Sequence, residues 1–440
     1  MPFYEEKDFS IYKHRRERLL NTVKGRHLAI KTGGILLVGI FEDEKIRFRQ
    51  DSTFYYFTGI EEPGAALWID LSGQTTLYIP DYKGGRSRWV ASTAELEQGE
   101  AEFFGFDEIE FLGKPCSSYK CFNFFVESEY EYLIQKLVDI VSDDGTIFTC
   151  NSASRHDYIK QKEFLKYLNQ SVHHVGPFPA DLLGATEDIS AIIAHMRRKK
   201  DQHEIELLYR AISITALAHG AAAQIIKPDR IEYQVQAAIE FIFTDEGGSV
   251  AFPSIVASGV NSTILHYTLN NRAIEKGDLV VVDIGAEYNY YCADLTRTYP
   301  ANKKFSKRQK EIYSLVLEVQ EYIAQIAKPG MWIINNDHKE QSLHHLAKAY
   351  FDRNGEYADY FLHNIGHFLG LDVHDVGNHV EPLCEGDVFT IEPGLYLSDE
   401  KIGIRIEDNY WMTEKGAVCL SEELPKSPEQ IEKMMQKEIE

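Results

Sequence analysis

The chain has 440 residues, of which 44% are hydrophobic and 26% are charged, and these values are ordinary for a globular protein. This length exceeds the size at which a single hydrophobic core usually stops growing, so we expect two domains. Asp and Glu number 68 against 46 Lys and Arg, and the resulting net charge of −22 argues against nucleic acids and anionic membranes as partners.

The amino terminus, residues 1–10, is charged and contains no apolar run, so no secretory signal is expected. No apolar stretch approaches the roughly 20 residues that span a bilayer. The six cysteines lack the paired spacing of a disulfide scaffold or a zinc ribbon. We therefore expect a cytoplasmic protein with reduced thiols.

The first expected domain, residues 1–178, alternates helical and strand patterns. Its predicted elements are a helix at 11–23, strands at 27–30 and 35–38, a hairpin at 65–79 that turns at Ser72-Gly73, and a helix at 122–141. The closely spaced prolines of residues 176–179 disfavour both helix and sheet, so this segment is predicted to be the linker.

The second expected domain, residues 179–440, begins with helices and then becomes rich in strands. Its predicted elements are helices at 203–225 and 231–243, strands at 248–257, 278–287 and 291–299, a helix at 306–327, and strands at 388–397 and 402–411. Two basic runs, Lys13 to Arg16 and Arg197 to Lys200, lie among acids and are interpreted as solvated helix faces.

The two strands on either side of Tyr288-Asn289-Tyr290 predict a hairpin. If its turn centres between Tyr288 and Asn289, Asp283 and Asp294 form a direct cross-strand pair. Like charges in that arrangement repel, and an apolar setting increases the penalty, which a bound cation would remove. The alternative is a pair of surface aspartates on an edge strand, and the hairpin alone does not distinguish the two interpretations.

Three histidines, His363, His367 and His374, follow within twelve residues. Such a group can bind zinc, relay protons or simply pack. The spacing of four between the first two suits one helix face, but Gly366 and Gly370 disfavour a regular helix.

Two later strands supply further acids. Glu392 ends the apolar run 389–391. In the alternating segment 403–407, Gly403, Arg405 and Glu407 share one face. A structural ion pair is an alternative role for Arg405.

Together, Asp283, Asp294, Glu392 and Glu407 carry four negative charges, which would balance two divalent cations. One histidine completes an oxygen-rich set that suits manganese or a similar metal better than a closed structural zinc site. Two adjacent metal ions can bridge a hydroxide, lower its pKa and polarise a carbonyl. These residues therefore predict hydrolytic chemistry.

The blocks that carry these residues resemble the pita-bread metallopeptidase family, which includes aminopeptidase P, prolidase and methionine aminopeptidase. The matching blocks, in the family's order, are ILHYTLN around His266, VVVDIGAEYNYYCADLTRTYP, HNIGHFLGLDVHD, FTIEPGLYL and GIRIED. Residues 48–69 are similar to the amino domain of aminopeptidase P, which methionine aminopeptidases usually lack. The resemblance implies an α+β fold, with an α/β-type amino-terminal domain at 1–178 and a pita-bread catalytic domain with a curved, mostly antiparallel sheet at 179–440.

The resemblance also implies a role for each site residue. Asp283 would bind one metal ion, His367 with Glu392 would bind the other, and Asp294 and Glu407 would bridge the pair. His266, His363 and His374 correspond to the family's substrate-binding and proton-handling histidines, and Arg405 corresponds to its arginine behind the ligands. Glu392 would take the proton of the attacking hydroxide, and His374 or His363 would stabilise the tetrahedral intermediate. The implied cofactors are two divalent metal ions, manganese first, with cobalt or zinc as alternatives.

The implied activity is that of a metal-dependent aminopeptidase that releases the N-terminal residue from peptides with proline at the second position. Prolidase, which cleaves Xaa-Pro dipeptides, is an alternative, and a non-catalytic peptide-binding pita-bread module is another. The YFTG motif after Arg49-Gln50-Asp51 and the carboxy-terminal segment 426–429 favour aminopeptidase P over prolidase. The presence of all five ligand residues argues against a non-catalytic binding module. The expected partners are peptide substrates and further copies of the chain in a dimer or tetramer.

Overall fold

The computed structural model describes residues 7–42, 47–82, 100–116, 125–151, 159–175, 181–377 and 380–436. The chain folds as two compact units, Met1–Met196 and Arg197–Glu440. The linker predicted at residues 176–179 lies outside the described residues, so the domain boundary at residue 178 stays a prediction. Among the described helices, none combines the length and the apolar character that crossing a bilayer requires.

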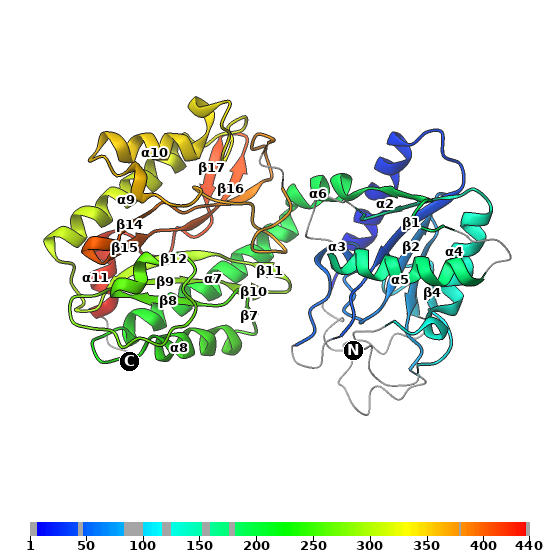
Figure 1. The fold of residues 1–440 in the computed structure, drawn as a ribbon, viewed down its shortest axis with the longest axis horizontal. Coiled ribbons are helices and arrows are strands. Elements are labelled where there is room, and N and C mark those ends of the chain that lie inside the picture. Colours follow the sequence, from blue (N-terminus) through cyan, green and yellow to red (C-terminus); the bar gives the residue numbers. More distant parts are fainter. Residues whose placement is uncertain are drawn as a thin grey trace. The chain divides into compact units, whose positions relative to one another are not determined.

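The described part of the first unit contains a mixed sheet with the strand order β4-β3-β2-β1-β5-β6. Figure 1 labels β1, β2 and β4 of this sheet. Its strands are β1 (Gly33–Val38), β2 (Ala66–Asp70), β3 (Thr75–Ile79), β4 (Glu108–Phe111), β5 (Thr146–Thr149) and β6 (Thr186–Asp188). Its helices are α2 (Phe9–Arg26), α3 (Ser52–Thr58), α4 (Glu131–Ser142), α5 (Ile159–Val175) and α6 (Ser190–Arg198), and α6 runs past the division between the units. Leu137 of α4 and Leu168 of α5 share a buried cluster with Leu36 and Trp68, so these helices cover one face of the sheet.

The hairpin predicted at 65–79 is confirmed by the antiparallel pairing of β2 with β3. The strand predicted at 27–30 is wrong, because these residues form the turn that ends α2. The His27 N–H donates to the Val23 carbonyl, and the Ile30 N–H donates to the His27 carbonyl. Of the helix predicted at 122–141, residues 122–124 lie outside the described part, and a short 3₁₀ helix, η3 (Glu127–Tyr130), leads into α4.

The two basic runs are largely buried, so their interpretation as solvated helix faces is wrong for most of their residues. Arg15, Arg16, Arg197, Arg198 and Lys200 are buried, whereas Lys13, His14 and Lys199 are exposed. Arg16 donates to two backbone carbonyls. Arg198 lies 2.6 Å from Asp387, and Lys200 lies 2.8 Å from Asp375. These partners are distant in the sequence, which is why the local pattern did not reveal them.

The second unit combines long helices with short antiparallel strands (Figure 1). Its helices are α7 (Gln202–Ile225), α8 (Glu232–Asp245), α9 (Lys307–Ile326), α10 (Leu343–Arg353) and α11 (Pro428–Gln436), with 3₁₀ helices η5 (Gly259–Thr263), η6 (Lys339–Gln341), η7 (Ala358–Tyr360) and η8 (Ser398–Glu400). Its strands are β7 (Ser249–Val250), β8 (Ile255–Ser258), β9 (Leu279–Ile284), β10 (Ala286–Tyr288), β11 (Tyr291–Cys292), β12 (Leu295–Pro300), β13 (Val388–Ile391), β14 (Gly394–Leu397), β15 (Ile402–Arg405), β16 (Asp408–Thr413) and β17 (Gly416–Cys419). The strand orders are β12-β9-β8, β11-β10-β7, β13-β16-β17 and β14-β15. The α+β class and the antiparallel pairing of the second unit are confirmed.

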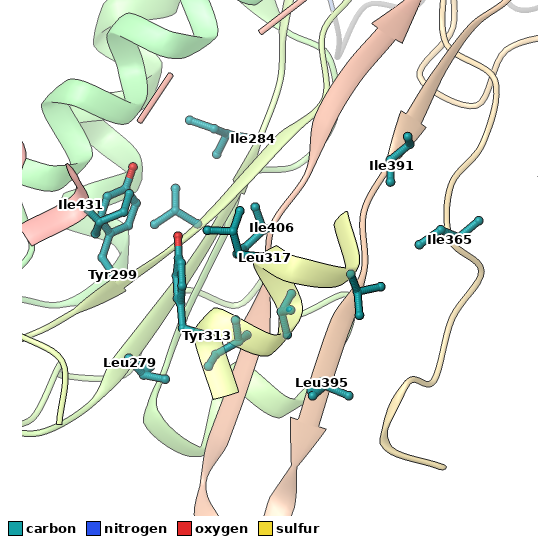
Figure 2. Packing of buried hydrophobic residues seen from close by; sticks show 14 of the residues in the cluster. Leu279, Ile284, Tyr299, Tyr313, Leu317, Ile365, Ile391, Leu395, Ile406 and Ile431 are labelled. Atoms are coloured by element: carbon teal, nitrogen blue, oxygen red, sulfur yellow. The ribbon is translucent and has the colours of Figure 1, made fainter. Parts of the chain in front are cut away.

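Residue alternation separates the core of this unit from its polar face. Ile404 and Ile406 are fully buried in a cluster with Tyr313 and Leu317 of α9. Figure 2 shows Ile406 beside Leu317 and Tyr313. Because successive side chains of an extended chain point to opposite faces, Arg405 lies on the other face. The hydrophobic cluster thus holds these strands from one side and leaves the other side for polar groups.

The central hairpin forms, but its register differs from the predicted one. Asn289 and Tyr290 both have positive φ, 46° and 73°, and they make a two-residue turn between β10 and β11. Asp283 therefore pairs with Thr296, and the predicted direct pairing of Asp283 with Asp294 is wrong. The register shift is two residues, which preserves the face of every side chain, so both aspartates still point to the same side.

Candidate metal centre

One cavity of about 650 Å³ in the second unit contains every site residue predicted from the sequence. The predicted residues that line it are Asp283, Asp294, His367, Glu392, Glu407, His266, His363, His374 and Arg405. Phe252, Pro253, Leu265 and Val373 contribute apolar wall. A cavity of this size with convergent acids and an apolar wall is typical of an active site. A second cavity, about 410 Å³ and formed by the first unit, has no carboxylate in its lining.

The four carboxylates come from strands or from the interruptions between them. Asp283 belongs to β9, and Asp294 lies between β11 and β12. Glu392 lies between β13 and β14, and Glu407 lies between β15 and β16. The Glu407 N–H donates to the Thr296 carbonyl at 3.1 Å, which connects the β15–β16 segment to β12.

Three of the predicted ligands form a tight group. Asp294, His367 and Glu407 each offer a ligand atom, and these atoms lie within 4.8 Å of one another. His367 Nε2 is 3.3 Å from Asp294 Oδ2 and 3.6 Å from Glu392 Oε1. His367 Nδ1 lies 3.1 Å from the Phe368 carbonyl, to which an Nδ1–H would donate, so that Nε2 is the nitrogen that faces the carboxylates of Asp294 and Glu392.

Crowding makes these acids difficult to ionise together. Burial raises the pKa of Asp294 well above its usual range, and the charges of Asp283 and Glu392 raise it further. Burial raises the pKa of Glu407 in the same way, with Asp294 as its strongest like-charged neighbour. Burial also raises the pKa of Glu392, although His367 and Arg405 oppose the effect. Such a set is stabilised in its ionised form by positive charge.

The donor set fits divalent metal ions. Among the described residues, Asp283 Oδ1 and Glu407 Oε1 are buried without a hydrogen-bond partner. Their companion oxygens are held, since Arg405 Nη2 donates to Asp283 Oδ2 at 2.6 Å and Thr296 Oγ1 donates to Glu407 Oε2 at 2.7 Å. A buried, unpartnered carboxylate oxygen costs free energy, which coordination to a cation would offset.

Two buried side chains that the sequence did not single out support this group. The Tyr396 hydroxyl lies 2.8 Å from Arg405 Nη1 and 2.8 Å from His363 Nε2. Thr390 Oγ1 accepts from the His367 N–H at 3.1 Å. The sequence held a signal for Tyr396. Strand alternation in the segment GLYL, residues 394–397, places Tyr396 on the same face as Gly394, and Gly394 is the strand partner of Arg405.

The three remaining histidines have different surroundings. Burial lowers the pKa of His363 to about 3, with Arg405 contributing, so its ring is neutral near pH 7. His363 Nδ1 lies 2.8 Å from the Asn364 carbonyl, so both ring nitrogens have protein partners. The His374 ring lies 4.2 Å from the His367 ring, between centroids. His266 is exposed at the cavity on the loop that follows η5.

A glycine permits the close approach of the His367 loop to β13. A Cβ at Gly366 would lie 2.0 Å from the Thr390 carbonyl oxygen. Only a residue without a side chain allows this approach, and it brings His367 beside the strand that leads to Glu392. The doubt about a helix here was justified, because residues 363–370 contain no helical turn.

Comparison with known proteins agrees with this geometry. Residues 206–414 match the metallopeptidase family M24, and residues 12–116 match the aminopeptidase P N-terminal domain. The Xaa-Pro aminopeptidase of Haemophilus influenzae is 40% identical over 56% of this chain and 63% of its own length, so that match spans less than two thirds of the relative. The Xaa-Pro aminopeptidase of Escherichia coli is 31% identical over 89% of this chain and 90% of its own length.

Two further similarities cover most of the chain. The Xaa-Pro dipeptidase of Pyrococcus furiosus is 31% identical over 83% of this chain and 90% of its own length. A structure of a variant Escherichia coli aminopeptidase P in complex with substrate superposes with a TM-score of 0.80 at 27% identity, over 98% of both chains.

The fold and the acid-lined cavity, together with these matches, define a metal-dependent hydrolase. With an aminopeptidase P amino-terminal domain ahead of the catalytic domain, the chain belongs to the aminopeptidase P group of metallopeptidase family M24. The family expected from the sequence blocks is confirmed.

Proposed function

We propose that the protein releases the N-terminal residue from peptides that carry proline at the second position. The observation that carries this proposal is the convergence of all predicted site residues on one cavity, with two buried carboxylate oxygens that have no hydrogen-bond partner among the described residues. Relatives named Xaa-Pro aminopeptidase support the substrate class.

The proposed cofactors are two divalent metal ions, with manganese as the first choice because the donor set is rich in oxygen. Asp283 would hold one ion and His367 with Glu392 the other, while Asp294 and Glu407 would be shared. When bound, such ions lower the pKa of water and polarise a carbonyl oxygen. The grouping of Asp294, His367 and Glu407 supports this assignment.

The other proposed roles in catalysis belong to individual side chains. Glu392 is the proposed proton acceptor, because burial raises its pKa toward the range useful for general-base catalysis. His374 and His266 are proposed to donate hydrogen bonds to the substrate. Arg405 holds Asp283 through a 2.6 Å contact and so keeps one carboxylate oriented. The partners of His363 favour an orienting role through Tyr396.

A prolidase activity is the second candidate, and the similarity to the dipeptidase of Pyrococcus furiosus favours it. The two candidates share their chemistry and differ in substrate length. An aminopeptidase hydrolyses a Xaa-Pro-Xaa tripeptide, whereas a prolidase is confined to the Xaa-Pro dipeptide.

The test is chelation with EDTA, followed by readdition of Mn²⁺, Co²⁺ or Zn²⁺ and assay on an Arg-Pro-Pro peptide. We expect activity to disappear with the chelator and to return best with Mn²⁺, with release of free arginine. A matched Arg-Ala-Pro peptide is the control and should not be cleaved. Hydrolysis confined to a Xaa-Pro dipeptide would replace the aminopeptidase proposal with prolidase. Failure to take up any of the three metals would contradict both.

Two properties of the whole protein complete the proposal. A cytoplasmic location is proposed from the six cysteines, which lack the paired spacing of a disulfide scaffold. Self-association into a dimer or tetramer is proposed from the resemblance alone, and light scattering of the purified protein measures it directly.

A further inference from the structure

The loop that carries His266 has little hydrophobic support of its own. Ile264 is 51% exposed and Leu269 is 73% exposed, so these flanking residues contribute little burial. Tyr267 is the exception, since its ring packs against Ile255 and Val281 in a small buried cluster. A histidine that must meet a substrate needs a defined position, and another interaction has to supply it.

That interaction comes from the fully buried carboxylate of Glu232, the first residue of α8. Its Oε1 accepts from the Ser258 N–H at 2.7 Å, from Ser258 Oγ at 2.6 Å and from Asn261 Nδ2 at 3.3 Å. Its Oε2 accepts from Tyr267 Oη at 2.7 Å and from the Arg272 N–H at 2.9 Å. One side chain therefore ties the start, the middle and the end of the segment 258–272.

The carboxylate connects this loop to the strands of the metal centre. Ser258 ends β8, which pairs with β9 so that Ile255 lies opposite Asp283. Tyr267 is the immediate neighbour of His266, and Glu232 holds its hydroxyl at 2.7 Å, so the backbone next to His266 is anchored. A shift of Glu232 would therefore move His266 relative to the predicted ligands.

We infer that Glu232 is a positioning residue, which holds the 258–272 segment so that His266 meets the substrate at the metal centre. This inference rests on the proposed function, because it assigns His266 a contact with the peptide. Glu232 itself lines no part of the catalytic cavity and acts only through the loop.

The isosteric variant Glu232→Gln tests this role with little change in shape. Each carboxylate oxygen faces a backbone N–H, from Ser258 or from Arg272, and a backbone donor cannot reverse its direction. Whichever oxygen the glutamine amide nitrogen replaces, one backbone donor then faces another donor. The substitution should therefore release one end of the loop.

We expect Glu232→Gln to lower kcat/KM about 100-fold, the loss that a small misplacement of a catalytic group produces. Its Mn²⁺ content should stay unchanged, and backbone amides of residues 259–272 should exchange hydrogen faster. In the background of His266→Ala, the same substitution should cost no further activity, because the group it positions is already absent. A purely structural role would instead give losses that multiply.

Glu246→Gln is the matched control, since Glu246 directly follows the same helix and accepts from Arg210 at 2.8 Å instead of contacting the loop. It should retain the original kcat/KM. If Glu232→Gln does not fold, Tyr267→Phe removes one of the same hydrogen bonds and should give a smaller loss with the same non-additivity.

Full activity of Glu232→Gln, unchanged exchange of residues 259–272, or multiplicative losses in the double variant would overturn the inference. The failure of the proposed function has a different signature, because the unsubstituted protein would then cleave no Xaa-Pro peptide. The exchange measurement still tests the anchoring in that case.

Discussion

Removal of the Tyr396 hydroxyl should weaken both the fold and the catalytic site. The Tyr396 side chain is 2% exposed, and its hydroxyl links Arg405 Nη1 to His363 Nε2 through two contacts of 2.8 Å. Tyr396→Phe keeps the ring and its packing but removes both hydrogen bonds. Arg405 and His363 would each retain a buried nitrogen without this partner.

The size of the effect follows from these two contacts. A buried polar group that loses its partner costs about 1–3 kcal/mol, so the two together predict a loss of about 2–6 kcal/mol in the free energy of unfolding. Arg405 also holds Asp283 Oδ2 at 2.6 Å, so a displaced guanidinium would loosen a proposed ligand. Groups that orient metal ligands typically contribute about 10–100-fold to activity or metal affinity, and we expect a fall in kcat/KM of that order.

Denaturant unfolding of the metal-free protein and peptide hydrolysis by the Mn²⁺-loaded protein measure the two effects separately. Tyr209→Phe is the matched control, because that ring is 46% exposed and the same change should alter stability by less than about 0.5 kcal/mol. If Tyr396→Phe behaves like the control in both assays, the hydroxyl does not couple Arg405 to the site and the reasoning is refuted.

The remaining tests concern one carboxylate, one buried histidine and one glycine. Burial and Asp283 raise the pKa of Asp294, and a carboxyl group with a raised pKa destabilises the fold when it is forced to ionise. Metal-free Asp294→Asn should therefore have a higher melting temperature than the metal-free parent at pH 8. It should lose the stabilisation by Mn²⁺, which is about 2.7 kcal/mol at a Mn²⁺ concentration of 100 times Kd. Melting curves with and without EDTA measure both effects. Burial lowers the pKa of His219 to about 3 in the folded protein. Between about pH 6.5 and pH 3 this histidine is therefore protonated in the unfolded chain and neutral in the folded protein. As the pH falls through that window, this histidine should lower the free energy of unfolding by about 1.4 kcal/mol per pH unit. Urea titrations should therefore show a flatter pH dependence for His219→Gln than for the parent. An unchanged slope contradicts the assignment. Gly366→Ala would place a Cβ 2.0 Å from the Thr390 carbonyl oxygen, so activity should fall about 100-fold, whereas Gly25→Ala, with no atom within 4 Å, should leave kcat/KM unchanged.

The residues singled out in the sequence all line one cavity, even though the central hairpin was placed in the wrong register. The turn residues Asn289 and Tyr290 carry no Gly to signal where φ becomes positive, so the turn was centred one residue too early. Moving a turn centre by one residue changes the pairing by two positions, and strand alternation has a period of two. The pairing partner of Asp283 was therefore wrong, while its side of the sheet was right.

The buried basic residues show what local pattern cannot supply. Arg198 and Lys200 resemble surface cations in sequence, because their carboxylate partners lie 189 and 175 positions away. Charged side chains are rarely buried unless they are paired, and the pairing is decided by tertiary structure alone. The same reason explains why Glu232 was missed, since its hydrogen-bond partners lie 26 to 40 positions away in the sequence.

The positions of the acids along the strands explain how a fold can bring like charges together. Asp294, Glu392 and Glu407 each lie where one strand has ended and the next has not begun, so the local backbone can turn their carboxylates toward the cavity. The hydrophobic cluster on the opposite face, with Ile404 and Ile406 packed against α9, fixes the strands and prevents these acids from separating into solvent. The repulsion is therefore built into the fold and can be relieved only by protons or by cations. Because protonated acids bind metal poorly, cation uptake near pH 7 should release protons into the solvent. Calorimetric titration with Mn²⁺ in buffers of different ionisation enthalpy counts those protons, and an uptake without proton release would show that the acids are already ionised in the metal-free protein.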